Sequence, residues 1–524
     1  MSPIELSIFA SRLASVCDEM GAVLRNAALS PNIRDRLDFS CAVFDAAGAL
    51  GAQAAHIPVH LGSMAYAMAD LVARLDWVDG DMAIVNDPFL GGTHLPDVTL
   101  IAPVLVGGER VAFVVNRAHH ADIGASTPGS MPLSSTLADE GVIIEPQHLV
   151  RAGRLDRVAL DRITARTRNP GHARGDFFAQ ISANRAGRER LKAMVAGLGV
   201  SAFREGLAAL NDYAERLATD ALTRIANGRY RFTDYMDDDG QGHQDIPIQV
   251  TLTAQDGQID CDFAGTAPQV SGNVNCPLAV AAAAVFYCFR CLMPPQTPAC
   301  AGSFRPIRLR APIGCLINAR RPAAVTAGNV ETSTRIVDAV LGALAQVPGL
   351  ADRIPAASHG SMNNLAIGGV YNDRPWDYYE TIGGGMGAGA RGGGLSAVQT
   401  HMTNTLNTPI EVIESRFPLR VKRYQRRRGS GGAGRRRGGD GLVRELECLA
   451  PAQATLIGER RRLAPWGLAG GSAGMPGRQW LDERPLPGKA AVSLTPGQRL
   501  RIETPGGGGW GAVVHSDDAI DPED

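Results

Sequence analysis

Apolar residues recur every three or four positions in several stretches of the chain, which predicts helices. Residues 4–29 show this spacing and are expected to form an amphipathic opening helix. Two charged helical runs follow within residues 155–229, and glycines near position 198 separate them. Further helices are expected at 277–293 and 327–345.

Short β-rich runs bounded by turn residues predict strands elsewhere. Residues 40–53 read as a hairpin, and residues 230–264 contain strands that turn at Asp256-Gly257. A short strand is also expected at 314–318, and several strands with glycine and proline turns follow residue 441. Helices and strands therefore both occur, in separate stretches.

This pattern predicts a mixed α/β (α+β), multi-domain fold, because 524 residues exceed one ordinary hydrophobic core. The expected units are a hairpin-rich N-terminal metal region at 1–150, a helical segment at 151–229, a mixed α/β central region with glycine-rich loops at 230–440, a small C-terminal β domain at 441–514 and an acidic tail at 515–524.

The most informative hairpin lies at residues 98–115. Its two apolar runs flank Gly107-Gly108-Glu109-Arg110, and a turn centred on the glycines places Asp97 opposite Ala118 and His119 opposite Pro96. The glycines and proline around His94 exclude a regular helix there, so a tight loop is expected to fold back on the strand ends. Two imidazoles and one carboxylate could then converge.

His94, Asp97 and His119 are therefore candidate ligands for a divalent metal ion, and Mn, Zn and Fe all suit such a nitrogen and oxygen set. His120 and Asp122 are candidate catalytic residues for proton transfer, because neighbours on an extended chain point to opposite sides. The competing interpretation is that these side chains only cap turns and fill polar loops.

Five further polar residues are candidates for the same site. Glu140 is a candidate general base or additional ligand, although a solvated acidic turn explains it equally well. His56 and His60 are candidates for a substrate pocket, against the alternative of buried structural histidines. Asn273 and Asn329 precede predicted helices, whose free backbone amides could bind a substrate carboxylate or imide oxygen.

Charge and composition narrow the function. Lysine and arginine number 52 against 53 acidic residues, which favours small-molecule chemistry and gives no reason to expect binding to nucleic acid or membrane. The N-terminal residues lack a signal-peptide pattern and the nine cysteines are scattered, so a cytoplasmic protein with reduced thiols is expected.

Two unusual stretches remain. The glycine run at 383–394 lacks the lysine and hydroxyl residue that end a P-loop, which favours a close-packed loop near the active site over a phosphate site. The basic run at 416–437 lacks interleaved aromatic residues, so a solvated loop or a partner-subunit surface is expected rather than a nucleic-acid site.

Several motifs together carry a family resemblance. They read NDPFLGGTHLPD, RAHHADIG, TPGSMP, SGNVNCPLAV, AGNVETSTRIVD and ETIGGGMGAGARGG. The chain resembles, over nearly its whole length, the B-subunit family of ATP-dependent hydantoinases and 5-oxoprolinases, which is similar to subunits of acetone and acetophenone carboxylases. In the carboxylases a metal is held by a His-x-x-Asp pair and a later histidine, and His94, Asp97 and His119 match that spacing.

The resemblance implies a division of labour within a hetero-oligomer. A separate A-type subunit with an actin-like ATPase fold uses ATP to phosphorylate the carbonyl oxygen of the substrate, and the B-type chain completes the reaction. The expected function is a hydrolase subunit that opens a hydantoin-like or 5-oxoproline-like cyclic amide with the help of a metal. The alternatives are a subunit of an ATP-dependent ketone carboxylase and a non-catalytic structural subunit.

Overall fold

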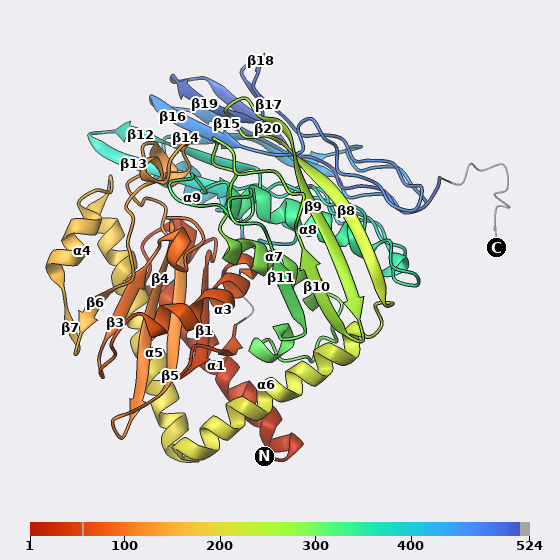
Figure 1. The fold of residues 1–524 in the computed structure, drawn as a ribbon. Helices are drawn as coiled ribbons and strands as arrows, with labels where there is room; N and C mark the ends of the chain where they lie inside the picture. The colour runs from red at the N-terminus through yellow and green to blue at the C-terminus, as the bar shows by residue number, and fades with distance from the viewer. Residues whose placement is uncertain (55–56, 514–524) are drawn as a thin grey trace, which may run out of the picture.

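The computed structural model describes residues 1–54 and 57–513. The candidate residue His56 and the expected acidic tail at 515–524 lie outside the described residues. Within the described part, helices and several sheets are combined, so the predicted mixed α+β fold is confirmed. Figure 1 shows the N-terminal sheet and the C-terminal strands at opposite ends, with the central segments between them.

The N-terminal sheet has seven strands in the order β2-β1-β5-β4-β3-β6-β7. Their bounds are β1 Phe39–Asp45, β2 Leu50–Gln53, β3 Met82–Val85, β4 Asp97–Val106, β5 Glu109–His119, β6 Gln147–Arg151 and β7 Arg154–Leu155. Helices α1 (Pro3–Ala27) and α5 (Pro170–Leu198) share one apolar core with the sheet, and α3 (Pro58–Ala73) packs on strand residues of the opposite parity. Both faces of this sheet are therefore covered.

The hairpin of β4 and β5 forms as predicted, but its register differs by one residue. Asp97 pairs with His119 and Val98 with Ala118, because an irregularity between Val104 and Leu105 leaves one extra residue on β5. The expected pairing of Asp97 with Ala118 is therefore wrong. The bulge matters because it brings Asp97 and His119 directly opposite each other.

Helices α4 (Arg157–Thr164), α5 and α6 (Val200–Leu222) confirm the predicted helical segment. The break falls at Gly199, where φ is 85°. In the described part of the chain no single helix has the length and apolar composition to cross a membrane; α5 and α6 meet the test only as a pair bent by 105°.

The central sheet has the order β11-β10-β9-β8, formed by β8 Gly228–Asp238, β9 Gln244–Gln255, β10 Gln258–Asp262 and β11 Ile307–Arg310. Helices α7 (Leu278–Arg290) and α8 (Ser333–Leu344) fill the core beside it. The strand expected at 314–318 is absent among these described residues, since Cys315 and Asn318 form only an isolated bridge across a tight turn.

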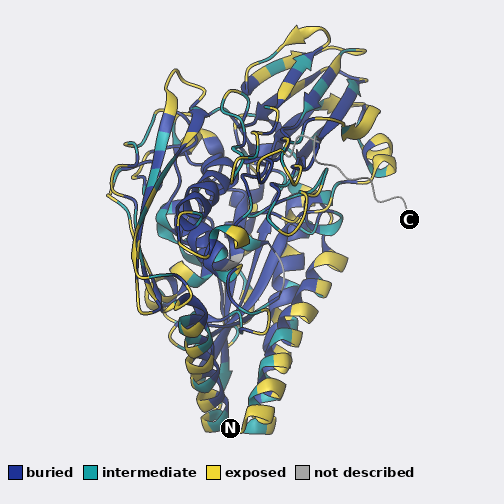
Figure 2. Ribbon diagram, turned by 90° about the vertical axis from the view of Figure 1, so that its right-hand side faces the viewer, coloured by how far each residue is buried: buried dark blue, intermediate teal, exposed yellow. Residues whose placement is uncertain are grey.

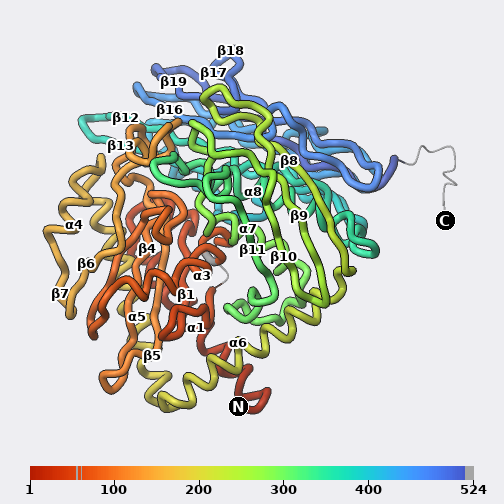
Figure 3. Tube along the Cα trace, in the orientation of Figure 1, coloured from red at the N-terminus to blue at the C-terminus, as the bar shows by residue number. Residues whose placement is uncertain are grey.

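Two further sheets form the C-terminal layer, with the orders β13-β12-β16-β19 and β14-β15-β20-β17-β18. Their bounds are β12 Asn364–Tyr371, β13 Arg374–Thr381, β14 Leu419–Arg427, β15 Gly441–Cys448, β16 Ala452–Ile457, β17 Arg478–Leu481, β18 Arg484–Pro485, β19 Lys489–Leu494 and β20 Arg499–Glu503. A shared apolar core lies between them. Strands before and after residue 441 pair with each other, so the expected boundary at 441 falls inside both sheets (Figure 3).

The basic stretch at 416–437 is not simply a loop. Its first part forms the edge strand β14, whose arginines face carboxylates of the neighbouring strand. Arg423 lies 3.3 Å from Glu445, and Lys422 lies 3.5 Å from Glu447. Local pairing within the sheet therefore offsets part of this positive charge.

Glycine-rich segments of this layer pack backbone against backbone. A Cβ atom on Gly385 would lie 2.0 Å from the carbonyl oxygen of Gly439, and one on Gly387 would lie 1.8 Å from that of Ala356. The amides of Gly385 and Gly394 donate to the carbonyl oxygens of Pro505 and Arg437. The close packing was predicted, and these amides are already used, as expected for a stretch that is not a phosphate loop.

Burial follows these layers. Figure 2 shows buried residues along the strands in the middle of the molecule and exposed residues on the outward faces of helices and hairpins. The polar motifs identified in the sequence lie mostly in the buried part, which a structural role alone does not require.

Candidate metal centre

A tight loop between β3 and β4 carries the first two candidate ligands. Gly91 has φ 108°, and a Cβ atom on Gly92 would lie 2.3 Å from the carbonyl oxygen of Asn86, so glycine is needed at both positions. The loop returns His94 to the start of β4, where Asp97 lies. His119 is the last residue of β5 and pairs with Asp97 across the hairpin.

The structure brings His94, Asp97 and His119 together. One ligand-type atom from each residue lies within 4.8 Å of the others, and all three side chains are buried. The Oδ1 atom of Asp97 is 3.2 Å from Nε2 of His94 and 3.0 Å from Nδ1 of His119. The bulged register produces this contact, since it sets Asp97 opposite His119.

The hydrogen bonds of His94 indicate that these residues fit a cation. Its Nδ1 lies 3.1 Å from the carbonyl oxygen of Thr326, which only accepts, so Nδ1 carries the proton and Nε2 presents a lone pair to Asp97. A lone pair facing a carboxylate is satisfied by a cation between them, or by a second proton. The Nε2 atoms of His94 and His119 are buried without a hydrogen-bond partner among the described residues. A divalent ion suits this donor set.

The charges within the cluster stabilise one another. Burial alone would raise the pKa of Asp97, but His60 and His94 hold it well below its usual range. Burial lowers the pKa of His94, and the Asp97 carboxylate outweighs that effect and raises it. Burial lowers the pKa of His119, where the hydrogen bond to Asp97 opposes it only partly.

The second oxygen of Asp97 is held by three other residues. Oδ2 accepts hydrogen bonds from Thr93 Oγ1 at 2.6 Å and from Asn329 Nδ2 at 3.2 Å, and Nε2 of His60 lies 3.1 Å away. The candidates Asn329 and His60 therefore lie at the cluster, in contact with Asp97. His60 Nδ1 lies 3.4 Å from the hydroxyl of Ser40. These contacts orient the carboxylate, as partners of metal ligands commonly do.

His120 points away from His119, as expected for adjacent residues on an extended chain. Its Nε2 lies 2.9 Å from Oε1 of Gln180 on α5. The Nε2 amide of Gln180 donates to the carbonyl oxygen of Val98, which fixes the orientation of the Gln180 amide. His120 must therefore carry its proton on Nε2, and its Nδ1 is left as an acceptor. Burial lowers the pKa of His120.

Asp122, Glu140 and Asn273 are all separated from the cluster by hydrogen bonds of their own. Asp122 accepts from the backbone amides of Gly124 and Arg168. Glu140 is buried, not solvated, and its Oε1 accepts from the amides of Val325 and Thr326 at 2.9 Å. Glu140 thus orients the segment whose carbonyl contacts His94.

The position of Asn273 follows the same principle. Its Nδ2 donates to the carbonyl oxygen of Pro132 at 2.7 Å, while its backbone oxygen accepts from Ala327 and Gly328. Asn273 therefore ties the start of the α8 region to the loop at 132. Its Oδ1 is buried without a hydrogen-bond partner in the described residues.

Tyr379 on β13 was not identified from the sequence. Its ring stacks on His119 with centroids 4.9 Å apart and planes at 14°, and the guanidinium of Arg36 lies 5.1 Å from its centroid. The only signal was its place in the motif that precedes the glycine run. Nothing in local spacing connects position 379 with position 119.

A surface cleft of about 1170 Å³ reaches this cluster from the outside. Tyr379 and His120 line it, together with Asp122, Asp377 and Arg168. Asp377 is two residues from Tyr379, hence on the same side of the strand. Burial, with Asp122 and Asp176 nearby, raises the pKa of Asp377 to about 7. The cleft therefore gives small molecules a polar route towards the candidate ligands.

Comparison with known proteins gives a consistent result. The description "Hydantoinase B/oxoprolinase" belongs to the family that matches residues 2–513. The chain is 38% identical to 5-oxoprolinase 1 of Arabidopsis thaliana over 98% of its own length and 42% of that protein. It is 31% identical to a Pseudomonas protein named as the B-type subunit of a D-/L-hydantoinase, over 98% and 90% of the two chains. The chain thus spans about two fifths of the length of the 5-oxoprolinase.

A solved structure agrees with the fold. The ATP-dependent caprolactamase of Pseudomonas jessenii superposes with a TM-score of 0.90 at 26% identity, over 98% of this chain and 91% of the other. The match spans all four sheets, and the family match spans nearly every residue. This chain belongs to the hydantoinase B/oxoprolinase family.

Proposed function

We propose that this chain is the B-type subunit of an ATP-dependent cyclic amidohydrolase, which opens a hydantoin-like or 5-oxoproline-like ring after a partner has phosphorylated the substrate. The observation that carries the proposal is the buried convergence of His94, Asp97 and His119. The names of the 5-oxoprolinase, hydantoinase and caprolactamase relatives support the choice of a cyclic amide.

His94, Asp97 and His119 would hold a divalent ion, with Mn, Zn and Fe as the candidates. Such an ion lowers the pKa of a water molecule and polarises a carbonyl group. The chain itself orients Asp97 through Thr93 and Asn329, and fixes His94 through the carbonyl oxygen of Thr326. These contacts prepare the site before substrate arrives.

Proton transfer is assigned to the cleft side of the site. His120, with its proton fixed on Nε2, presents Nδ1 as an acceptor, and Asp122 lines the same cleft. Ring opening requires that the released nitrogen gains a proton and that the attacking water loses one. The pair of groups beside the cleft suits that exchange.

The partner is proposed to be an A-type ATPase subunit. The hydantoinase relative is named as one subunit of its enzyme, and the 5-oxoprolinase relative is a longer chain of which this protein matches about two fifths. The glycine run of this chain is packed internally and lacks a P-loop pattern. ATP would therefore be used on the partner, in a hetero-oligomer.

The test combines the purified chain with an A-type subunit, ATP and a panel of hydantoins and lactams. The expected result is ring opening that requires both chains and ATP, and that His94→Ala abolishes. Turnover of ketones that requires bicarbonate would instead support a carboxylase. Activity of the complex that His94→Ala leaves unchanged would contradict any catalytic role for the cluster and favour a structural subunit.

A further inference from the structure

A π-helical turn, Gly328–Thr332, lies between the metal cluster and the C-terminal layer. Asn329 contacts Asp97 on one side of this turn, while Glu331 contacts the loop before β12 on the other. Residues two apart on such a turn face nearly opposite directions, which explains the division. π-Helical turns frequently occur at functional sites, and this one joins two parts of the molecule.

Glu331 is a buried carboxyl group with an uneven set of partners. Its Oε1 accepts hydrogen bonds from Ser361 Oγ at 3.1 Å, from the Met362 amide at 3.2 Å and from Asn364 Nδ2 at 2.7 Å. Its Oε2 is buried and has no hydrogen-bond partner among the described residues. Burial and the nearby Glu459 raise the pKa of Glu331 to about 8, so the group is mainly a neutral acid near pH 7.

The partner Asn364 continues the connection to the metal cluster. Its Nδ2 also donates to the carbonyl oxygen of Ile457 at 3.2 Å, so the orientation of its amide is fixed. Its Oδ1 therefore faces Tyr379 and accepts from the tyrosine hydroxyl at 2.7 Å. The Tyr379 ring in turn stacks on His119. Glu331 is thus connected to both Asp97, through the turn, and His119, through Tyr379.

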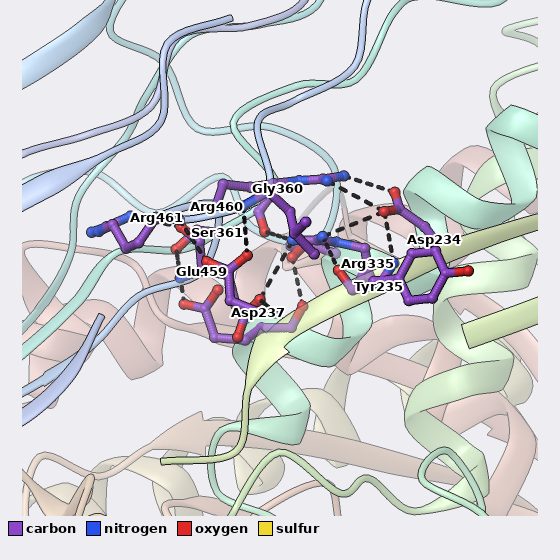
Figure 4. Close-up of polar contacts among 12 residues, drawn as sticks. Asp234, Tyr235, Asp237, Arg335, Gly360, Ser361, Glu459, Arg460 and Arg461 are labelled. Carbon is purple, nitrogen blue, oxygen red and sulfur yellow. Dashed lines mark hydrogen bonds and ion pairs between the residues drawn. The ribbon is translucent and has the colours of Figure 1, made fainter. Parts of the chain in front are cut away.

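Charged groups on the far side of Glu331 form the network drawn in Figure 4. Glu459 pairs with Lys489, and its Oε2 accepts from the backbone amide of Asp237 at 2.7 Å. The backbone amide of Glu459 donates to Ser361 Oγ at 3.1 Å. Since Ser361 Oγ also accepts from the Asn363 amide, the hydroxyl proton of Ser361 is left for Glu331.

The network has four acidic and four basic members apart from Glu331. The acidic side chains are Asp234, Asp237, Asp338 and Glu459, and the basic ones are Arg335, Arg460, Arg461 and Lys489. At its edge, the partly exposed Asp238 also lies 3.5 Å from Lys489. A charged Glu331 would add a further buried anion close to Glu459, which a protein avoids at considerable cost.

We propose that Glu331 is a positioning residue of the metal centre, which as a neutral acid holds Asn329 against Asp97 and Tyr379 against His119. The importance of this role for catalysis rests on the proposed function, but the role itself can be measured without metal or substrate. Glu331→Gln keeps the size of the side chain and its neutral acceptor oxygen. It therefore separates the neutral acid from the titrating acid.

The first measurement follows the ring resonances of His119 by NMR in the metal-free, histidine-labelled full chain, with His119→Ala to assign them. The Tyr379 ring shifts these resonances because it stacks on the imidazole. The expected result for the natural chain is a transition near pH 8 that Glu331→Gln lacks, with the shift at pH 7 retained in that variant. Glu331→Ala is expected to lose the stacked shift already at pH 7.

The second measurement is unfolding by urea as a function of pH, again without metal. A folded-state pKa above the ordinary value means that the folded chain keeps its proton while the unfolded chain loses it, so stability falls as pH rises through this window. The unfolding constant of the natural chain, relative to that of Glu331→Gln, should rise by about two to three orders of magnitude between pH 5 and pH 9.

Glu445→Gln is the matched control, because Glu445 is a buried carboxylate of β15 paired with Arg423, outside this network. It should leave the His119 resonances unchanged. A transition near pH 8 that persists in Glu331→Gln, or a His119 shift unaffected by Glu331→Ala, would overturn the proposal. Failure of the natural chain to bind Co²⁺ would count against the proposed function instead, and would leave the measurements on Glu331 intact.

Discussion

The side-chain amide of Asn329 donates a hydrogen bond to Oδ2 of Asp97 at 3.2 Å, across 232 positions of the sequence. This contact joins the π-helical turn before α8 to the N-terminal hairpin. It places the turn beside the candidate ligands and leaves Asn329 Oδ1 buried without a hydrogen-bond partner in the described chain. The centre is therefore completed only when the two regions pack together.

Removing this amide should weaken metal binding without abolishing it. We expect Asn329→Ala to lower the affinity for Zn²⁺ by about tenfold, the usual effect of losing a partner of a metal ligand. A competition titration with a chelating dye would measure it. Asn227→Ala is the control, because Asn227 pairs with Asp256 at an exposed turn. Equal affinities for both variants would contradict the assigned role.

The three candidate ligands should each be needed for the metal. The natural chain is expected to carry about one divalent ion after purification with metal, and His94→Ala, Asp97→Ala and His119→Ala should each carry almost none. Elemental analysis of the folded proteins would show this. His172→Ala tests specificity, since His172 is exposed and lies in the cleft away from the cluster. A natural chain without metal under replete conditions would exclude the proposed centre.

The contact between His120 and Gln180 makes a separate prediction about stability. Gln180→Leu leaves the Nε2 proton of His120 and the carbonyl oxygen of Val98 without their partner, so the free energy of unfolding should fall by about 1 to 3 kcal/mol. Urea unfolding would measure the change. Ser182→Ala, on the exposed side of α5, should have little effect. A neutral Gln180→Leu would mean that His120 is not held in this way.

Two glycines of the same segment should respond very differently to alanine. Gly387→Ala would place a Cβ atom 1.8 Å from the carbonyl oxygen of Ala356, whereas Gly389 has no atom within 4 Å of that position. We expect Gly387→Ala to destabilise the protein by more than about 3 kcal/mol and Gly389→Ala by less than about 1 kcal/mol. Thermal unfolding would compare them. Similar values would show that the glycine segments are not tightly packed.

Asp377 should make stability depend on pH. Its pKa is raised to about 7, so the folded chain keeps a proton that the unfolded chain releases between about pH 4 and pH 7, and stability falls as pH rises through that range. Asp377→Asn lacks this loss and should gain about 2 kcal/mol over the natural chain between pH 5 and pH 8. Asp373→Asn, at the exposed hairpin tip, is the control. Parallel pH profiles for Asp377→Asn and the natural chain would contradict the raised pKa.

Local sequence determined much of the fold and part of the centre. The apolar spacing of α1 and α5 and the turn residues of the β4–β5 hairpin specify those elements, because both depend on neighbours a few positions apart. His94, Asp97 and His119 could be grouped for the same reason, since one hairpin carries them. His120 could be separated from His119 from the alternation of an extended strand alone.

Tertiary structure decided the remainder. The bulge near Val104 set Asp97 opposite His119, and its position depends on packing across the sheet rather than on the turn residues. Contacts of Asn329, Glu331 and Tyr379 with the centre join segments more than two hundred positions apart or cross between sheets. No local spacing encodes them, because such contacts arise only when separate apolar cores pack and bring their buried polar groups to one place.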